Sequence, residues 1–266
     1  MNLYLARRGE AGPSSDDPGA ADAPALTLLK HLDELRRRIV YAVATIGVGM
    51  VIAFAFITQI FEFIFRPIRA VLPPGSKLIY TEPGEAFSVY VQIALVAGIV
   101  LAAPFVMYQV WCLVAPLLYA RQKRFVLPFI LLTTGGFVLG AAFNHYIAFR
   151  WMVVFFGSFS SLNLTFMPRL DDIFGLYTKM LFGMGLVFQM PAVVYFLAKM
   201  GLVSAGFLLK QFKYAILAIV VIAAVVTPTG DATTQVVFAL PMVGLYLISI
   251  LIAWIVYPVA RPDNGA

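Results

Sequence analysis

The fold is decided at one charged stretch, His31-Leu32-Asp33-Glu34-Leu35-Arg36-Arg37-Arg38-Ile39, which runs without interruption into a long apolar segment. Apolar residues in and just before it recur at steps of four, three and four: Leu28, Leu32, Leu35 and Ile39. This is the spacing of one face of an α-helix, with the charges on the other face. The pattern indicates a helix that begins at a membrane surface and then enters the bilayer.

The residues alone leave two interpretations of the charged face open. In the first, Asp33 pairs with Arg37 and Glu34 with Arg38 across one helical turn, while the arginines anchor the helix at the cytoplasmic surface. In the second, the carboxylates bind a cationic ligand where water meets the bilayer. Both interpretations place a helix end at the membrane surface.

The composition predicts a polytopic membrane protein, because 62% of the 266 residues are hydrophobic and only 12% are charged. The net charge of +6 is spread over short loops. It therefore points to the anionic cytoplasmic leaflet rather than to nucleic acid. The single cysteine, Cys112, lies in an apolar run, where it cannot form an internal disulfide and is expected to be a small buried hydrophobe.

Apolar windows predict an all-α protein with six transmembrane helices, at residues 39–57, 88–110, 125–149, 173–198, 214–226 and 234–252. The last two are expected to be short. The fifth would give only about 20 Å of helix, so the pair should thin the bilayer or be shielded by partner helices. Residues 62–87 contain several prolines and glycines among apolar residues, which predicts a small periplasmic cap in the first far-side loop.

The chain outside the spans divides into a disordered cytoplasmic tail at residues 1–26, a membrane domain at 27–256 and a short cytoplasmic tail at 257–266. Arg7-Arg8 does not begin a cleaved signal, because no apolar segment follows it. Thirteen of the nineteen lysines and arginines fall on one side: Arg7, Arg8, Lys30, Arg36, Arg37, Arg38, Arg121, Lys123, Arg124, Lys199, Lys210, Lys213 and Arg261. The positive-inside rule then places both termini in the cytoplasm.

Three further polar positions lie in or next to the predicted spans. His145 is expected near the far end of the third span, where water reaches it, as an interfacial hydrogen-bonding group or a proton relay. Asp171 or Asp172 is expected to cap the fourth span. Gln189 lies near the middle of that span, just before Met190-Pro191.

Several functional classes are excluded or weakened. The sequence has no Gly-rich phosphate loop with lysine and no His/Cys/Glu cluster at metal-ligand spacing, so we expect no enzyme, cofactor or metal site. Intramembrane hydrolysis would need ionisable residues inside facing spans, and these are nearly absent. A secondary transporter of a small solute is the alternative function, although the spans show no clear inverted repeat.

A series of motifs in fixed order resembles the TatC family, the membrane receptor subunits of the twin-arginine protein translocase. The resemblance extends over roughly residues 27–256. After the opening stretch, its motifs are Phe65-Arg66-Pro67-Ile68, Leu72-Pro73-Pro74-Gly75, Tyr80-Thr81-Glu82-Pro83-Gly84-Glu85-Ala86-Phe87, Ala103-Pro104-Phe105, Tyr108-Gln109-Val110-Trp111, Ala115-Pro116-Leu117-Leu118-Tyr119, Phe188-Gln189-Met190-Pro191, Thr227-Pro228-Thr229-Gly230-Asp231 and Ala239-Leu240-Pro241-Met242.

This resemblance implies a receptor in the cytoplasmic (inner) membrane that binds the twin-arginine signal peptides of folded precursors at its cytoplasmic face. It also implies a hetero-oligomer with single-span TatA-type and TatB-type subunits, surrounded by membrane lipids and driven by the proton-motive force rather than ATP. Carboxylates at a membrane surface suit this role, because they bind planar guanidinium groups in bidentate fashion.

The resemblance also assigns residues. It implies that Glu34 is the signal-binding carboxylate, with Arg36 as its neighbour in the motif. The family's second acidic position falls on Gln122, which accepts hydrogen bonds but carries no charge. The site should therefore depend more on Glu34, helped by Asp33, although these two lie about 100° apart around the helix.

The remaining assignments concern the spans and the far-side loops. Gln189 stands where many members carry a membrane-embedded glutamate, so it cannot titrate; a partner-helix contact, a lipid-thinning role and an ordinary inter-helix hydrogen bond are all open. Pro67, Glu85 and Asp231 belong to far-side loop motifs. Asp231 corresponds to a position linked to translocation, and it could equally cap the last helix.

Overall fold

The computed structural model describes residues 19–72, 78–114, 126–159, 166–227 and 232–256 of the chain. Within these ranges the chain is helical, and its only β-type pairing is an isolated bridge between Ile79 and Arg169. The elements are α1 (Gly19–Ala55), α2 (Ile57–Arg69), α3 (Glu85–Val114), α4 (Val126–Phe143), the π-helical turn η3 (Asn144–Ala148), α5 (Phe149–Gly157), α6 (Leu170–Val187), α7 (Met190–Lys199), α8 (Ala205–Lys210), α9 (Phe212–Val226) and α10 (Ala232–Val256).

The helices are long and apolar enough for a multi-pass membrane protein. Five segments could span a bilayer by length and composition: Leu32–Ala55, Glu85–Cys112, Phe129–Gly157, Leu170–Lys199 and Ala232–Val256. The shorter apolar helix Phe212–Val225 supplies a sixth crossing. The predicted all-α architecture is confirmed.

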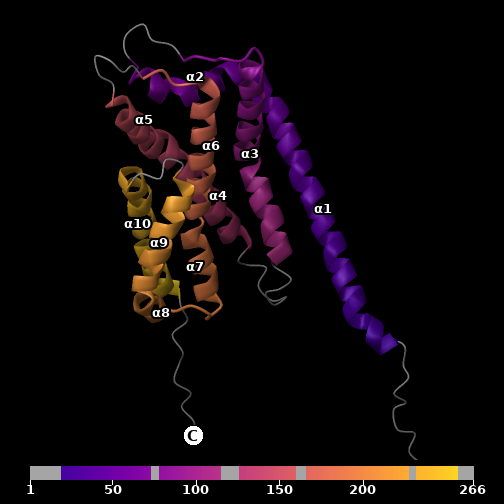
Figure 1. The fold of residues 1–266 in the computed structure, drawn as a ribbon. Coiled ribbons are helices and arrows are strands. Elements are labelled where there is room, and N and C mark those ends of the chain that lie inside the picture. The colour runs from indigo at the N-terminus through magenta and orange to yellow at the C-terminus, as the bar shows by residue number, and fades with distance from the viewer. Residues whose placement is uncertain (1–18, 73–77, 115–125, 160–165, 228–231, 257–266) are drawn as a thin grey trace, which may run out of the picture.

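Both ends of the described chain lie at one end of the bundle. The start of α1, the ends of α3 and α10, and the short helix α8 all lie toward that end, whereas α2 lies across the opposite end (Figure 1). Because the basic last turns of α7 and α8 lie at the first of these ends, it is the cytoplasmic one. The cap predicted for the first far-side loop is formed by α2, which buries Ile64, Phe65 and Ile68.

Helix lengths differ from the sequence prediction at two places. Helix α1 begins at Gly19, inside the segment expected to be a tail. Of the two last helices expected to be short, α9 has 15 residues, or about 22 Å. The prediction was too short for α10, which has 25 residues and can span a bilayer alone.

Two spans are interrupted. The third consists of α4, η3 and α5, and the fourth consists of α6 and α7 with a break at Phe188 and Gln189. Pro191 lies in the first turn of α7, where its missing N–H costs no helical bond. His145, in η3, is only 5% exposed, because the Phe63 ring of α2 stacks on it at 3.9 Å. The expectation that water reaches His145 is therefore wrong.

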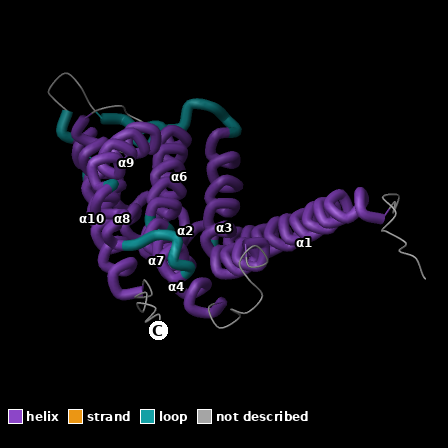
Figure 2. Tube along the Cα trace, turned by 90° about the horizontal axis from the view of Figure 1, so that it is seen from below, coloured by secondary structure: helices purple, strands orange, loops and turns teal. Residues whose placement is uncertain are grey.

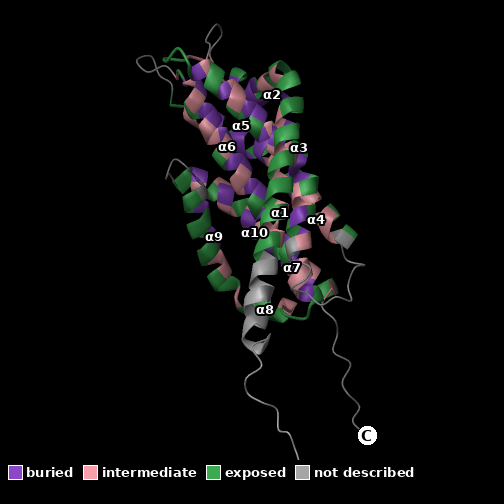
Figure 3. Ribbon diagram, turned by 90° about the vertical axis from the view of Figure 1, so that its right-hand side faces the viewer, coloured by how far each residue is buried: buried purple, intermediate pink, exposed green. Residues whose placement is uncertain are grey.

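Helix α1 packs mainly against α3 and leaves the rest of the bundle toward its N-terminal end, as the view from below shows (Figure 2). Buried residues are most frequent nearer the α2 end of the molecule (Figure 3). The contact between α1 and α3 depends on two glycines. A Cβ on Gly49 would lie 2.6 Å from the Gly98 carbonyl oxygen, and one on Gly98 would lie 2.5 Å from the Met50 nitrogen. Such small residues let helix backbones approach closely in membranes.

Gly49→Ala should destabilise the chain, because the added methyl group meets backbone that cannot move aside. We expect a loss of about 1–3 kcal/mol of unfolding free energy, the usual cost of overpacking. Gly47→Ala is the matched control, since a Cβ there meets nothing within 4 Å. Thermal unfolding in detergent should show a lower midpoint for the first variant only; equal midpoints would contradict the close approach.

Candidate functional site

The charged turn of α1 and the end of α3 enclose an open cavity of about 540 Å³. Its lining comes from the start of the span Leu32–Ala55 and the end of the span Glu85–Cys112, so it lies toward the cytoplasmic end of the two helices. Both walls contribute charged or polar side chains: Asp33, Glu34, Arg37, Arg38 and Tyr41 from α1, and Tyr108 and Gln109 from α3. A water-side cavity of this kind suits a charged ligand better than an apolar one.

Glu34 and Arg38 form the ion pair at the centre of this cavity. Arg38 Nε donates to Glu34 Oε1 at 3.2 Å, and Arg38 Nη2 contacts the same oxygen. Arg38 Nη1 also donates to Gln109 Oε1 at 3.4 Å, so this guanidinium joins α1 to α3. The Glu34 side chain is 41% exposed and that of Arg38 22%, which leaves the carboxylate accessible from the cavity.

The second predicted ion pair, between Asp33 and Arg37, is not formed among the residues that the structure describes. Instead, Arg37 Nε donates to Tyr41 Oη at 3.1 Å, and its guanidinium carbon lies 5.4 Å from the centre of the Tyr41 ring. This is a cation–π arrangement. Asp33 lines the cavity without pairing with Arg37. It lies about 100° from Glu34 around the helix.

Some of the site residues predicted from the sequence are brought together here. Asp33 and Glu34 both line the cavity, whereas Arg36 is exposed and does not. Gln122 and Asp231 lie outside the described residues. Sequence reasoning did not assign five further lining residues to the site: Arg37, Arg38, Tyr41, Tyr108 and Gln109. The signals were the four-residue step from Arg37 to Tyr41 and the position of Tyr108-Gln109 at the near end of the second span.

Gln189 lies at the break between α6 and α7. Its Nε2 donates to the carbonyl oxygens of Thr133 in α4, at 3.1 Å, and of Gly185, at 3.2 Å. Its Oε1 is buried without a hydrogen-bond partner in the described part of the chain. An inter-helix hydrogen bond, one of the three roles left open for this residue, is therefore present.

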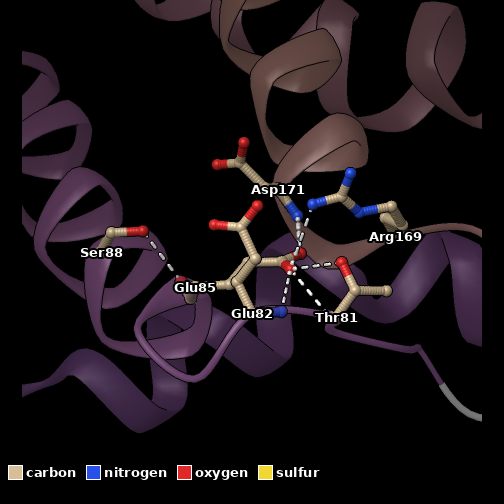
Figure 4. A network of polar contacts seen from close by, with 6 residues as sticks. All are labelled: Thr81, Glu82, Glu85, Ser88, Arg169 and Asp171. Carbon is tan, nitrogen blue, oxygen red and sulfur yellow. Dashed lines mark hydrogen bonds and ion pairs between the residues drawn. The ribbon is translucent and has the colours of Figure 1, made fainter.

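A second polar network, centred on Glu85, joins the two far-side loops (Figure 4). Glu85 is 6% exposed. Its Oε2 accepts from the backbone N–H groups of Thr81 at 2.9 Å and Glu82 at 3.4 Å, and from Arg169 Nη2 at 3.3 Å. The Glu85 carboxylate in turn raises the pKa of the Arg169 guanidinium above its ordinary value, so this arginine stays charged.

Glu85 also caps α6. Its Oε1 accepts from the Asp171 N–H at 3.2 Å, in the first turn of that helix. The expectation that Asp171 or Asp172 caps α6 is wrong, because Arg169 occupies the N-cap position and makes no side-chain cap bond. The carboxylate of the first residue of α3 takes that role, aided by the positive end of the α6 dipole. Pro67, the other far-side residue predicted, lies partly buried inside α2.

The fold and the first cavity define a multi-pass helical membrane protein with a carboxylate–guanidinium site at the cytoplasmic end of its first span. The family model described as Sec-independent protein translocase protein (TatC) matches residues 30–241. The Sec-independent protein translocase protein TatC of Koribacter versatilis is 40% identical over 239 residues, covering 89% of this chain and 88% of that protein. That of Desulforapulum autotrophicum is 42% identical over 222 residues, covering 84% and 82%.

Solved structures of the same family are similar to this chain. A crystal structure of the twin-arginine translocase receptor TatC superposes with a TM-score of 0.72 at 34% identity, covering 84% of this chain and 97% of that one. A second crystal structure of this receptor, in DDM, gives 0.74 at 33% identity. The chain belongs to the TatC family and is a multi-pass protein of the inner membrane. The alternative of a small-solute transporter is not supported.

Glu85→Gln should loosen the far-side cap, because the amide presents N–H donors where Thr81, Asp171 and Arg169 need an acceptor. We expect the thermal unfolding midpoint to fall by several degrees and the loop before Leu170 to become more sensitive to protease. Glu82→Gln is the matched control, since Glu82 enters the network through its backbone N–H. Equal behaviour of the two variants would show that the Glu85 charge is not needed there.

Proposed function

We propose that this chain is the receptor subunit of a Sec-independent translocase and binds the twin-arginine signal peptides of folded precursors in the cavity around Glu34. The observation that carries the proposal is the Glu34–Arg38 pair: an accessible carboxylate that already holds a guanidinium group, in a cavity open to water. The names of the relatives and solved structures support the same class of function.

The chemistry of the pair suits an arginine ligand. A carboxylate has lone pairs enough for two guanidinium groups, and the planar fork of arginine matches its geometry. Arg37 and Arg38 oppose an incoming cation by charge repulsion. Gln109 can reduce this repulsion. Its Oε1 already accepts a hydrogen bond from Arg38, so it can hold the Arg38 side chain while a ligand arginine binds to the Glu34 carboxylate.

The aromatic rings of the cavity add a second kind of contact. Tyr41 and Tyr108 both line it, and Arg37 already lies over the Tyr41 ring. A ligand arginine can stack on such a ring as well as bond to the carboxylate, and lysine, which lacks the planar group, gains less. The cavity therefore offers discrimination between arginine and lysine through geometry, beyond charge alone.

The other proposed contributions are secondary. Asp33 adds negative charge at the cavity wall. We assign Gln122 the role of a neutral acceptor for the signal peptide, and Asp231 a role in translocation. Single-span TatA-type and TatB-type subunits are the proposed partners in a complex driven by the proton-motive force, and the 15-residue length of α9 supports a neighbouring helix that shields it.

Glu34→Gln should weaken binding of a twin-arginine peptide about tenfold or more, because a hydrogen bond to a charged group contributes roughly 1.5–3 kcal/mol. Binding is measured by photocrosslinking from α1 to a labelled signal peptide in membranes that contain the whole complex. Glu62→Gln, an exposed carboxylate on α2 at the far end, is the control. Unchanged crosslinking in a correctly inserted Glu34→Gln chain would refute the proposal.

Gln122→Glu should restore a second charge and tighten binding of an Arg-Arg peptide more than that of a Lys-Lys peptide, since a carboxylate binds the guanidinium fork in bidentate fashion. The measurement is the ratio of the two affinities in the variant and in the unchanged chain. An equal gain for both peptides would mean that residue 122 contributes only unspecific charge.

A further inference from the structure

A second cavity of about 360 Å³ lies below α2, between α3 and α4. Its walls are apolar except at one end, where His145, Tyr146 and Tyr177 contribute. Tyr146 is 63% exposed, and Leu101 and Val138 on the other walls are also exposed. Because these exposed residues belong to spanning segments, the cavity opens toward the lipid.

We propose that this groove binds one anionic phospholipid of the outer leaflet, with an acyl chain in the groove and the phosphate between Arg66 and Arg150. The proposal is independent of the signal-peptide site, which lies toward the other end of α1 and α3. It rests on two features: the order of chemistry along the groove and the placement of the two arginines.

The segment from α4 through η3 into α5 changes its chemistry in the order of a phospholipid. Val138, Ala141 and Ala142 are apolar lining residues, and His145 and Tyr146 are polar lining residues at one edge. Arg150 follows beyond the lining and is charged. At about 1.5 Å per residue, Arg150 lies about 7 Å beyond His145. The acyl chain, the ester groups and the phosphate of a phospholipid would meet these apolar, polar and charged residues in turn. The imidazole Nδ1 of His145 is 3.5 Å from Tyr177 Oη, so this contact holds the polar side chains in place.

The two arginines each follow, by about one helical turn, an aromatic residue that lines the groove. The rings of Phe63 and Tyr146 are 6.3 Å apart. Further along both segments, a Cβ on Gly157 would lie 2.5 Å from Val71 Cγ1, so α2 and the segment from η3 to α5 run side by side in the same direction. Arg66 follows Phe63 by one turn, and Arg150 follows Tyr146 by one turn.

Both guanidinium groups are available to a ligand. Arg66 and Arg150 are exposed, and neither forms an ion pair within the part of the chain that the structure describes. Arg66 lies about 60° from Phe63 around α2, whereas Arg69 lies about 120° from it. Two arginines from different helices, each about one turn beyond a lining residue, favour a phosphate group.

The surroundings of the groove favour a lipid over a partner helix. Exposed apolar side chains of α3 and α4 line it, and two exposed arginines lie beyond its polar end. An extended acyl chain is narrow enough to enter it, and the outer leaflet brings such a chain and a phosphate to the same place.

The test is native mass spectrometry of the purified full-length chain, titrated with phosphatidylglycerol or with phosphatidylcholine. The unchanged chain should retain one phosphatidylglycerol more tightly than phosphatidylcholine. Arg66→Gln and Arg150→Gln should each weaken phosphatidylglycerol about fivefold, as expected for one basic residue at an anionic headgroup. Arg69→Gln, on another face of α2, should bind as the unchanged chain does.

Ala142→Phe tests the acyl-chain part by filling the groove, and Leu101→Trp at the exposed rim serves if Ala142→Phe does not fold. Either substitution should weaken the binding of both lipids, although both arginines are still present. Equal retention of the two lipids by the unchanged chain, or equal loss in Arg69→Gln and Arg66→Gln, would overturn the proposal. So would a groove-filled variant that keeps its lipid but loses a co-purifying single-span subunit, because the groove would then be a helix site.

Discussion

Water does not enter the hydrocarbon layer, and this constraint arranges nearly every charged group of the chain. Backbone groups there must be satisfied within helices, and ionised side chains must lie at the ends of the bundle or find partners. Two ion pairs follow this rule at opposite ends: Glu34 with Arg38 toward the cytoplasmic end, and Glu85 with Arg169 at the far end. Between them the long spans carry mostly apolar side chains, which need no specific partner in lipid.

The two ion pairs use the same chemistry for different purposes. Glu85 is almost completely buried, and both of its oxygens are occupied by donors from two loops, so it fixes the entry of the chain into α3 and α6. Glu34 is accessible, and its arginine partner is shared with Gln109 on the neighbouring helix. A carboxylate whose donors are all supplied by the fold serves stability, whereas one at a cavity wall can exchange partners and serve binding.

The sequence predicted what depends on local pattern. Uncharged windows located the spans because the bilayer imposes a minimum apolar length, and the four-residue step from Glu34 to Arg38 predicted that ion pair. It did not predict contacts set by tertiary packing. The cap of α6 comes from Glu85, 86 positions before Asp171. Gln109 meets Arg38 only because α1 and α3 cross closely at Gly49 and Gly98, and His145 is covered only because α2 folds back over it.

Gln189 shows how a broken helix can be repaired from within the membrane. Its backbone N–H bonds to Leu186 at the end of α6 rather than to Gly185, which leaves the Gly185 carbonyl without its usual partner. The side-chain amide donates to that oxygen and to the Thr133 carbonyl on α4. An ionised glutamate at this position would face two carbonyl oxygens with no proton to donate, and a protonated one could make only one of the two bonds. The neutral amide therefore makes both bonds at the break between α6 and α7, which a carboxyl group at this position could not do.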